Sequence, residues 1–220
     1  MPTISCVIPA YNEEKNIKPL LQAVKESGFF EEIIVVNDGS TDRTAEFIQQ
    51  EEFGIIFINL QENVGKAGAV WEGFCKAKGD IILMLDADLV GIGRHTFAEL
   101  VRPLLSKTAE VCVGVINSGG HMPWIDFFQK RLHMLSGQQA FWRHLVADAE
   151  HIKDKRFGLE TYLRDHFRSK GVRIETIKLA GITHLLKEQK MGLAKGFVKR
   201  IKMFKEIAVS IILLLFGSNK

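Results

Sequence analysis

Residues 80–88 read Asp-Ile-Ile-Leu-Met-Leu-Asp-Ala-Asp, an apolar run that ends in two carboxylates. Five consecutive apolar residues between polar ones are typical of a short strand that is buried on both faces of a sheet. Three earlier runs have the same character: Thr3–Pro9, Glu32–Asn37 and Gly54–Ile58. The segments between these runs have apolar residues at helical spacing, so strands and helices alternate along the chain. This alternation predicts an α/β fold with a largely parallel sheet.

The remaining elements follow from the same two periodicities. We expect a first helix that begins near Asn12 as its N-cap and ends at Gly28. Further helices are predicted over residues 40–50, 65–78, 96–105 and 158–170, and further strands over 110–115 and 173–180. The segments 124–135 and 138–149 also have helical spacing.

The length of the chain, 220 residues and 24.8 kDa, suits one large domain with an appendage. Hydrophobic residues make up 46% and charged residues 25%, which excludes disorder, collagen and coiled coil as descriptions of the whole chain. The cysteines Cys6, Cys75 and Cys112 are odd in number and far apart. We therefore expect neither a disulfide framework nor a zinc cluster, and a cytoplasmic compartment. The first nine residues lack the pattern of a cleaved secretory signal.

The C-terminal segment, residues 186–220, differs from the predicted domain over residues 1–185. Residues 186–206 hold seven Lys or Arg against two Asp or Glu, although the net charge of the chain is only +3. Apolar residues recur there at intervals of three and four: Phe197, Ile201, Phe204, Ala208, Ile211 and Leu215. This pattern predicts a basic amphipathic helix that makes peripheral contact with the inner face of the cell membrane. Packing on the domain, or on a second subunit of a homo-oligomer, is the alternative.

Polar residues follow the predicted strands at the edge where open parallel sheets bind ligands. Four such segments occur, at residues 9–14, 37–42, 86–88 and 183–184. Asp86 and Asp88 can reach one hard divalent cation, and Mg²⁺ or Mn²⁺ prefers carboxylate oxygens together with substrate phosphates. A solvated turn is the alternative for an isolated Asp-x-Asp. The three neighbouring loops favour the metal site.

Two further residues point to a nucleotide. Asp38 follows a buried strand and precedes Gly39, so its carboxylate can face the strand ends and accept a hydrogen bond from a nucleobase N–H. Lys66 begins a predicted helix, where backbone N–H groups and a cation both suit phosphate. The chain lacks the spacing of a Walker loop, and it has no Gly-x-Gly-x-x-Gly turn after the first strand. A dinucleotide dehydrogenase is therefore disfavoured.

Four motifs together resemble those of the family 2 glycosyltransferases. They are Pro-Ala-Tyr-Asn-Glu-Glu at 9–14, Asn-Asp-Gly-Ser-Thr-Asp at 37–42, Asn-x-Gly-Lys-x-x-Ala at 63–69 and Asp-Ala-Asp at 86–88, in the family's order. The resemblance implies a GT-A fold, in which helices flank a mixed, mostly parallel central sheet. It also implies a UDP- or GDP-sugar donor and a divalent metal. By this resemblance the nucleotide-sugar is bound by Pro9, Tyr11, Glu13, Asp38, Lys66 and Asp86, and the metal by Asp86 and Asp88.

The second half of the chain resembles the family less sharply. Phe157-Gly-Leu-Glu160 is similar to the family's acceptor-side acidic motif, which makes Glu160 the candidate general base. A glutamate that only stabilises a helix start is the alternative. The segment 136–141 resembles the one that shapes the donor-sugar and acceptor pocket. His184 resembles a late histidine that completes the metal site in some members, and a packed or exposed histidine is the alternative.

The predicted activity is metal-dependent hexosyl transfer, with Asp88 and Glu160 as catalytic residues. A hydroxyl acceptor would need Glu160 as base, whereas a polyprenyl phosphate is already ionised at neutral pH. The basic C-terminal segment favours a lipid-linked or polyprenyl-phosphate acceptor. A small soluble acceptor such as phosphoglycerate is the alternative, and so is a nucleotide-sugar binding protein without turnover. A nucleotidyltransferase is disfavoured because its glycine-rich, arginine-bearing N-terminal loop is missing. We expect no nucleic-acid partner.

Overall fold

The structure, a computed structural model, describes residues 1–51, 54–116, 136–154 and 158–184. The strands are β1 Ile4–Ala10, β2 Glu32–Asp38, β3 Ile55–Leu60, β4 Ile81–Met84, β5 Leu89–Val90, β6 Val111–Ile116, β7 Gln138–Trp142, β8 Ile174–Leu179 and β9 Thr183–His184. The helices are α1 Ile17–Glu26, α2 Thr44–Gln49, α3 Lys66–Lys76, α4 Arg94–Leu105 and α6 Leu159–Ser169, with 3₁₀ turns η1 Arg143–Val146 and η2 Glu150–Ile152.

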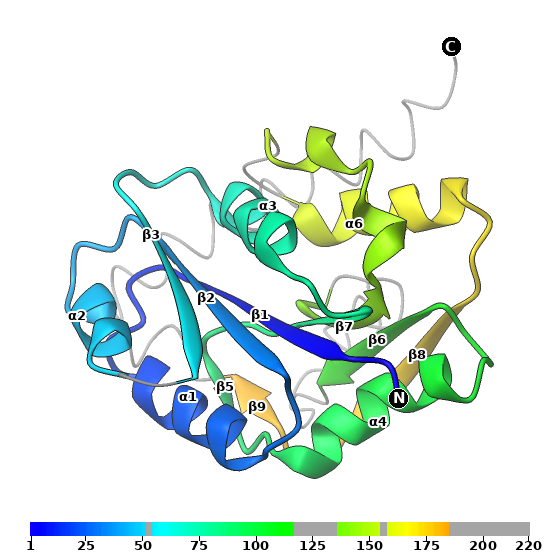
Figure 1. Cartoon of the computed structure of the whole chain (residues 1–220), viewed down its shortest axis with the longest axis horizontal. Helices are drawn as coiled ribbons and strands as arrows, with labels where there is room; N and C mark the ends of the chain where they lie inside the picture. Colours follow the sequence, from blue (N-terminus) through cyan, green and yellow to red (C-terminus); the bar gives the residue numbers. More distant parts are fainter. Residues whose placement is uncertain (52–53, 117–135, 155–157, 185–220) are drawn as a thin grey trace, which may run out of the picture. The chain divides into compact units, whose positions relative to one another are not determined.

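Seven strands form one mixed sheet in the order β3-β2-β1-β4-β7-β6-β8 (Figure 1). The pairs β1–β2, β2–β3, β1–β4 and β6–β8 are parallel, whereas β7 runs antiparallel to both β4 and β6. The predicted mixed, mostly parallel sheet is thus confirmed. The chain builds outward from β1 to β3 and then returns to the other side of β1 as β4. Such a reversal is the switch point at which open α/β sheets bind ligands.

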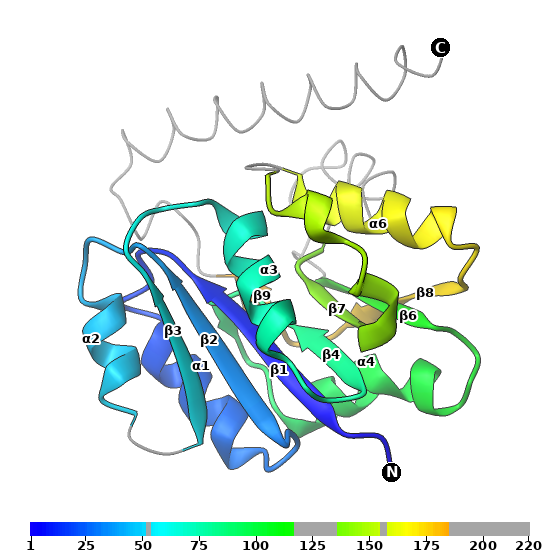
Figure 2. The same cartoon turned by 45° about the horizontal axis from the view of Figure 1, so that its top comes forward.

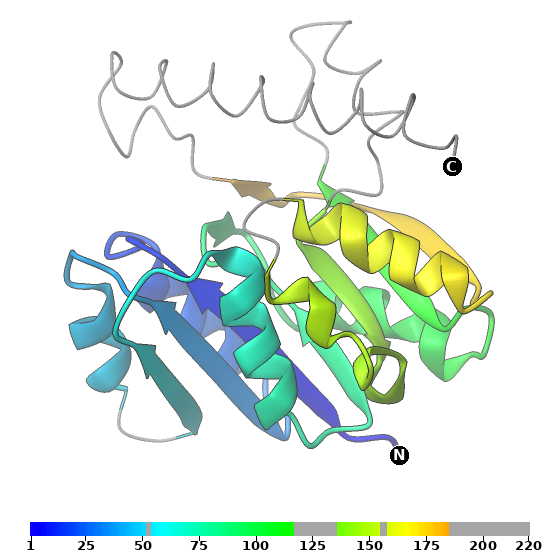
Figure 3. The same cartoon turned by 90° about the horizontal axis from the view of Figure 1, so that it is seen from above.

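Helices cover both faces of the sheet, as Figures 2 and 3 show. One hydrophobic cluster joins α1 and α4 to one face, and a second joins α3, α6 and the 3₁₀ turns to the other. Alternation along β1 divides its side chains between the two clusters: Cys6 and Ile8 enter the first, and Val7 enters the second. The continuous apolar run in the sequence reflects this double burial.

The expected helix over residues 138–149 is wrong. Residues Gln138–Trp142 form β7, whose backbone pairs with β4 on one side and β6 on the other. Two short 3₁₀ turns follow in place of a continuous helix. The helical spacing was misleading because both neighbours of this strand come from distant parts of the chain. The segment 124–135 lies outside the described residues.

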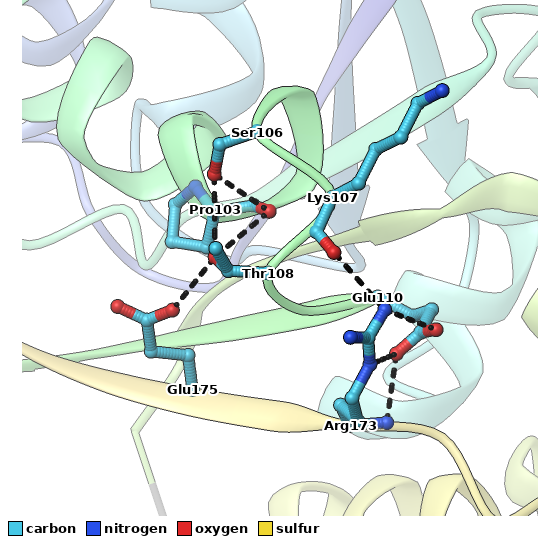
Figure 4. A network of polar contacts seen from close by, with 7 residues as sticks. All are labelled: Pro103, Ser106, Lys107, Thr108, Glu110, Arg173 and Glu175. Atoms are coloured by element: carbon cyan, nitrogen blue, oxygen red, sulfur yellow. Dashed lines mark hydrogen bonds and ion pairs between the residues drawn. The ribbon is translucent and has the colours of Figure 1, made fainter.

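A network of hydrogen bonds holds the start of β8, the outer strand of the sheet (Figure 4). The Arg173 backbone N–H donates to Glu110 Oε2 at 2.8 Å, and its guanidinium donates to Glu110 Oε1 and to the Lys107 carbonyl. The Thr108 hydroxyl donates to Glu175 Oε2 at 3.1 Å. These contacts join the residues before β6 to the start of β8, so they hold the register of that parallel pair.

The described residues between 1 and 183 form one compact unit. In the described part of the chain, no helix combines the length and apolar character that crossing a bilayer requires. The predicted basic segment, residues 186–220, lies outside the described residues.

Candidate functional site

The switch point between β1 and β4 explains how a proline fits in a central strand. The pairing of β1 with β4 ends at Val7, opposite Met84, whereas β1 stays paired with β2 as far as Ala10. The Val7 carbonyl accepts the Leu85 N–H, so by two-residue alternation Pro9 also turns its backbone nitrogen toward the β4 side. No ladder bond is lost there, because β4 has already ended. Pro9 therefore marks the point where the two strands stop pairing.

The loops after β1 and β2 are bonded to one another. The Asn12 N–H donates to the Ser40 hydroxyl at 3.0 Å, and the Thr41 N–H donates to Asn12 Oδ1 at 2.9 Å. The Glu13 N–H donates to Thr44 Oγ1 at 2.7 Å. Two of the predicted motifs, 22 or more residues apart in sequence, thus form one surface at the end of the sheet.

Asn12 is not the N-cap of the first helix. It has a left-handed backbone, with φ of 55°, and α1 begins only at Ile17. Its side-chain oxygen instead accepts a hydrogen bond from the Thr41 N–H of the neighbouring loop. Asparagine side chains often bond to backbone groups in loops, and such bonds compete with helix capping. Asp42 stabilises the start of α2, since its Oδ1 accepts the Thr44 N–H.

The residues predicted to surround the nucleoside lie at this edge of the sheet. Tyr11 is 43% exposed, and Pro9 is buried in β1. The Glu13 carboxylate accepts a hydrogen bond of 2.6 Å from Asn16 Nδ2. Their contact with a nucleoside stays a prediction.

Asp38 ends β2 and is 97% buried, with 3% of its surface exposed. Its Oδ1 accepts the Val64 N–H at 2.7 Å, and its Oδ2 accepts the Gly65 N–H at 3.1 Å and the Asn63 side-chain amide at 3.0 Å. The carboxylate therefore holds the loop that leads into α3. Its predicted bond to a nucleobase would add to this role.

Lys66 begins α3 and lies between two carboxylates that the sequence had placed in separate motifs. Its Nζ is 2.6 Å from Asp86 Oδ1, after β4, and 2.5 Å from Glu160 Oε1, in the first turn of α6. The three side chains are 35%, 20% and 17% exposed, so they are shielded but remain open to a ligand. The structure thus brings the predicted donor side and acceptor side to one point.

The two carboxylates stabilise the charged form of Lys66. Partial burial lowers the pKa of Lys66, but the charges of Asp86 and Glu160 outweigh it and raise that pKa above its ordinary value. Lys66 is therefore a permanent cation at neutral pH. With two carboxylates and one ammonium, the cluster carries a net negative charge in the protein alone.

A further contact was missed in the sequence. Asp86 Oδ2 accepts a hydrogen bond of 2.9 Å from Gln138 Nε2, at the start of β7. The resemblance of segment 136–141 to a pocket-shaping motif could have indicated this contact. Because a helix was expected over residues 138–149, no partner could be predicted for Gln138. Both oxygens of Asp86 are thus oriented by the protein.

The strand end fits a divalent cation. Asp86 and Asp88 could supply hard oxygen ligands, and Asp86 Oδ1 already contacts a cation, the Lys66 ammonium. Among the residues that the structure describes, no three His, Cys, Asp or Glu side chains converge. A metal here would therefore need oxygen ligands from substrate and water as well. The structure does not describe the His184 side chain, so its role as a metal ligand stays a prediction.

Residues 5–182 match the family model for glycosyl transferase family 2. A dolichyl-phosphate beta-glucosyltransferase of Trichomonas vaginalis is 34% identical over 185 residues, which cover 74% of this chain and 52% of that protein. An undecaprenyl-phosphate 4-deoxy-4-formamido-L-arabinose transferase of Photorhabdus laumondii is 39% identical over 123 residues, 52% of this chain and 36% of that protein. The chain spans about half or less of the length of these curated relatives.

Solved structures of glucosyl-3-phosphoglycerate synthase from Mycobacterium tuberculosis share the fold. The complex with Mn²⁺, UDP-glucose and phosphoglyceric acid matches with a TM-score of 0.66 at 26% identity, over 84% of this chain and 72% of that chain. The complex with Mn²⁺, UDP and glucosyl-3-phosphoglycerate matches with a TM-score of 0.64 at 27% identity. The GT-A fold implied by the resemblance is thereby confirmed.

Proposed function

This chain belongs to glycosyltransferase family 2, and on that basis we propose that it transfers a hexosyl group from a nucleotide-diphosphate sugar to a polyprenyl phosphate. The observation that carries the proposal is the Lys66 ammonium, held between Asp86 and Glu160 at the carboxyl edge of the sheet. A cation at a helix start beside two carboxylates suits a diphosphate that arrives together with a divalent metal.

UDP-glucose is the donor to test first. The relative with the longest match reported above is named a glucosyltransferase, and the solved structures that share the fold hold UDP-glucose or UDP with Mn²⁺. Asp38, at the end of β2, and the loop that it holds are proposed to bind the nucleoside, and β1 lies between β2 and the strand that leads to Asp86. A GDP-sugar is the other donor class that the motifs allow.

Asp86 and Asp88 would hold the Mg²⁺ or Mn²⁺. When bound, the ion would neutralise charge that develops on the diphosphate as the glycosidic bond breaks. Lys66 would act beside it. Its ammonium can exchange the Glu160 carboxylate for diphosphate oxygens, which become more negative in the transition state and so attract the cation more strongly.

The acceptor is proposed from the state of Glu160. Oε1 of this carboxylate accepts a hydrogen bond from the Lys66 ammonium, so Glu160 is paired with a cation in the protein alone. A phosphate acceptor is ionised at neutral pH and needs no base, so this arrangement suits it. The two curated relatives described above are named for dolichyl-phosphate and undecaprenyl-phosphate transfer.

A small soluble acceptor is the second candidate. The solved structures that share the fold hold phosphoglyceric acid or its glucosylated form. Transfer to such an acceptor uses a hydroxyl, for which Glu160 would have to leave Lys66 and act as general base.

The test is transfer of radiolabelled glucose from UDP-glucose, with Mn²⁺ or Mg²⁺, to a polyprenyl phosphate in detergent micelles or to 3-phosphoglycerate. Labelled product in the organic phase supports the proposal, and labelled product only in the aqueous phase supports the second candidate. Donor binding without any transfer would favour a nucleotide-sugar binding protein. Parallel reactions with GDP-sugars distinguish the two donor classes.

The C-terminal segment is proposed to bring the domain to the acceptor's membrane. Its sequence carries the charge excess and the apolar stripe that an interfacial helix needs. Flotation with vesicles that contain anionic lipid, compared between the full chain and a chain that ends near residue 186, tests this. Equal partitioning of the two would contradict it.

A further inference from the structure

We propose that Gln138 is the positioning residue that holds Asp86 in the orientation in which it binds the divalent cation. The inference rests on the proposed function, because it assigns Asp86 to that cation. Asp86 uses its two oxygens differently: Oδ1 faces the Lys66 ammonium at 2.6 Å, and Oδ2 accepts the Gln138 amide at 2.9 Å. The carboxylate therefore cannot rotate without breaking one of these contacts.

The sheet register brings Asp86 beside Gly137, the residue that precedes Gln138. In the antiparallel pair of β4 and β7, Met84 lies opposite Gln139. Two residues further along, the same register puts Asp86 opposite Gly137. A Cβ atom on Gly137 would lie 2.1 Å from Asp86 Oδ2 and 2.3 Å from Oδ1, which no side chain could tolerate. The glycine thus leaves the room in which the Asp86 carboxylate lies.

Gln138 is itself held firmly. It is 1% exposed, and a buried amide that lost its partners would cost free energy. Because a carboxylate can only accept, the NH₂ group is the end of the amide that faces Asp86, and Gln138 Oε1 lies against the Ser136 hydroxyl. Since the amide is neutral, it orients Asp86 without cancelling the negative charge that attracts a cation. Groups that orient ligating carboxylates in this way act strongly on metal affinity.

The chain offers a matched control on the same strand. Gln139 is 2% exposed, and its amide donates to the Ser136 carbonyl at 2.8 Å. Successive side chains of a strand point to opposite faces, so Gln139 turns away from the face that Gln138 occupies. The substitutions Gln138→Met and Gln139→Met both remove a buried amide from β7, but only the first removes a bond to Asp86.

The experiment titrates Mn²⁺ into the full chain with UDP-glucose present and no acceptor, and measures free Mn²⁺ by electron paramagnetic resonance. We expect Q138M to raise the Mn²⁺ Kd about 10–100-fold, the range known for substitutions behind metal ligands. Q139M should leave the Kd within about threefold of wild type, a change smaller than any in that range. Circular dichroism and thermal melting verify that each variant folds.

The outcomes separate this inference from the proposed function. Equal Mn²⁺ affinity in Q138M and Q139M, whether both are normal or both weak, would overturn the positioning role. Should Q138M not fold, Ser136→Ala replaces it, because loss of the hydroxyl releases the Gln138 amide and should weaken Mn²⁺ binding in the same direction. Unchanged affinity in S136A would then count against the role. Wild-type Mn²⁺ binding without transfer to any acceptor would refute the proposed function and leave the positioning role standing.

Discussion

Gly39 lets the loops after β2 and β3 meet. Its φ is +61°, and a Cβ atom there would lie 2.5 Å from the Glu62 carbonyl carbon and 2.6 Å from the Asn63 nitrogen. The close approach is what allows the preceding Asp38 to bond the backbone of residues 64 and 65. One glycine therefore supports the contacts of Asp38 with the loop before α3.

We predict that Gly39→Ala destabilises the fold more than Gly28→Ala does. Both glycines have left-handed backbones, but Gly28 has no atom within 4 Å of a new Cβ. G28A should lose roughly 1–2 kcal/mol from backbone strain alone, and G39A roughly 1–3 kcal/mol more from overpacking. Urea denaturation of the two variants measures the difference in the free energy of unfolding. Equal losses of this free energy in G39A and G28A would contradict the prediction, because the loops after β2 and β3 would then separate without destabilising the fold.

Glu160 reports the acceptor class. We predict that Glu160→Gln keeps Mn²⁺-dependent UDP-glucose binding and reduces transfer to a polyprenyl phosphate by less than the about 10²–10⁴-fold that loss of a general base costs. The reason is that an ionised phosphate needs no base, while Lys66 keeps Asp86 as a partner. Initial rates and donor titrations measure the two effects. The control is Asp165→Asn on the same helix, since Asp165 pairs with Arg164 instead. A loss of transfer to the polyprenyl phosphate of about 10²-fold or more in E160Q alone would contradict the prediction.

Glu32 links β1, β2 and the start of β4 at the amino ends of these strands. From the start of β2, its Oε1 accepts the Ser5 hydroxyl of β1 and the Gly79 N–H before β4, the latter at 3.0 Å. Burial raises the pKa of Glu32, but these hydrogen bonds and that from the Lys78 N–H outweigh it, so the pKa lies below its ordinary value of 4.5. The central strands are thereby fixed relative to one another at their amino ends.

We predict that Glu32→Gln lowers the free energy of unfolding at pH 7 by about 1 kcal/mol or more, because hydrogen bonds to a charged acceptor are stronger than those to an amide. The depressed pKa stabilises the fold above pH 4.5, and this contribution is lost as the pH falls through the folded-state pKa. The gap between wild type and E32Q should therefore close in acid. Denaturation at pH 7 and pH 3.5 measures it, with the exposed Glu62→Gln as control; a gap independent of pH would contradict the prediction.

At the scale of the whole molecule, the reversal of strand order at β1 and β4 gathers loops from both halves of the chain. Asp38 comes from one side of β1, and Asp86, Gln138 and Glu160 from the other. A ligand that contacts both sides stabilises the folded state as a whole, because it binds only when all these elements are in place.

We predict that UDP-glucose and Mn²⁺ together raise the melting temperature, by about 5–10 °C at a hundred times the Kd, from roughly 2.7 kcal/mol of linkage. Asp88→Ala should abolish the part of the shift that depends on Mn²⁺, and an exposed variant such as Glu62→Gln should keep it. Differential scanning fluorimetry measures the shift. A metal-dependent shift that survives in D88A would remove Asp88 from the metal site.

Local sequence patterns predicted the strands β1 to β4 and the helices between them, although not the start of α1, together with the family motifs and the strand ends at which Asp38, Asp86 and Asp88 lie. These features depend on residues that are near neighbours in the chain, so local periodicity and motif spacing carry them. Three features depend on long-range packing: residues 138–142 form a central strand, Lys66 joins Asp86 to Glu160, and the Gln138 amide donates to Asp86. The Lys66–Glu160 contact spans 94 residues and the Gln138–Asp86 contact 52. Such contacts arise from strand order and register, which are set by burial of both sheet faces against helices, and local periodicity does not specify these.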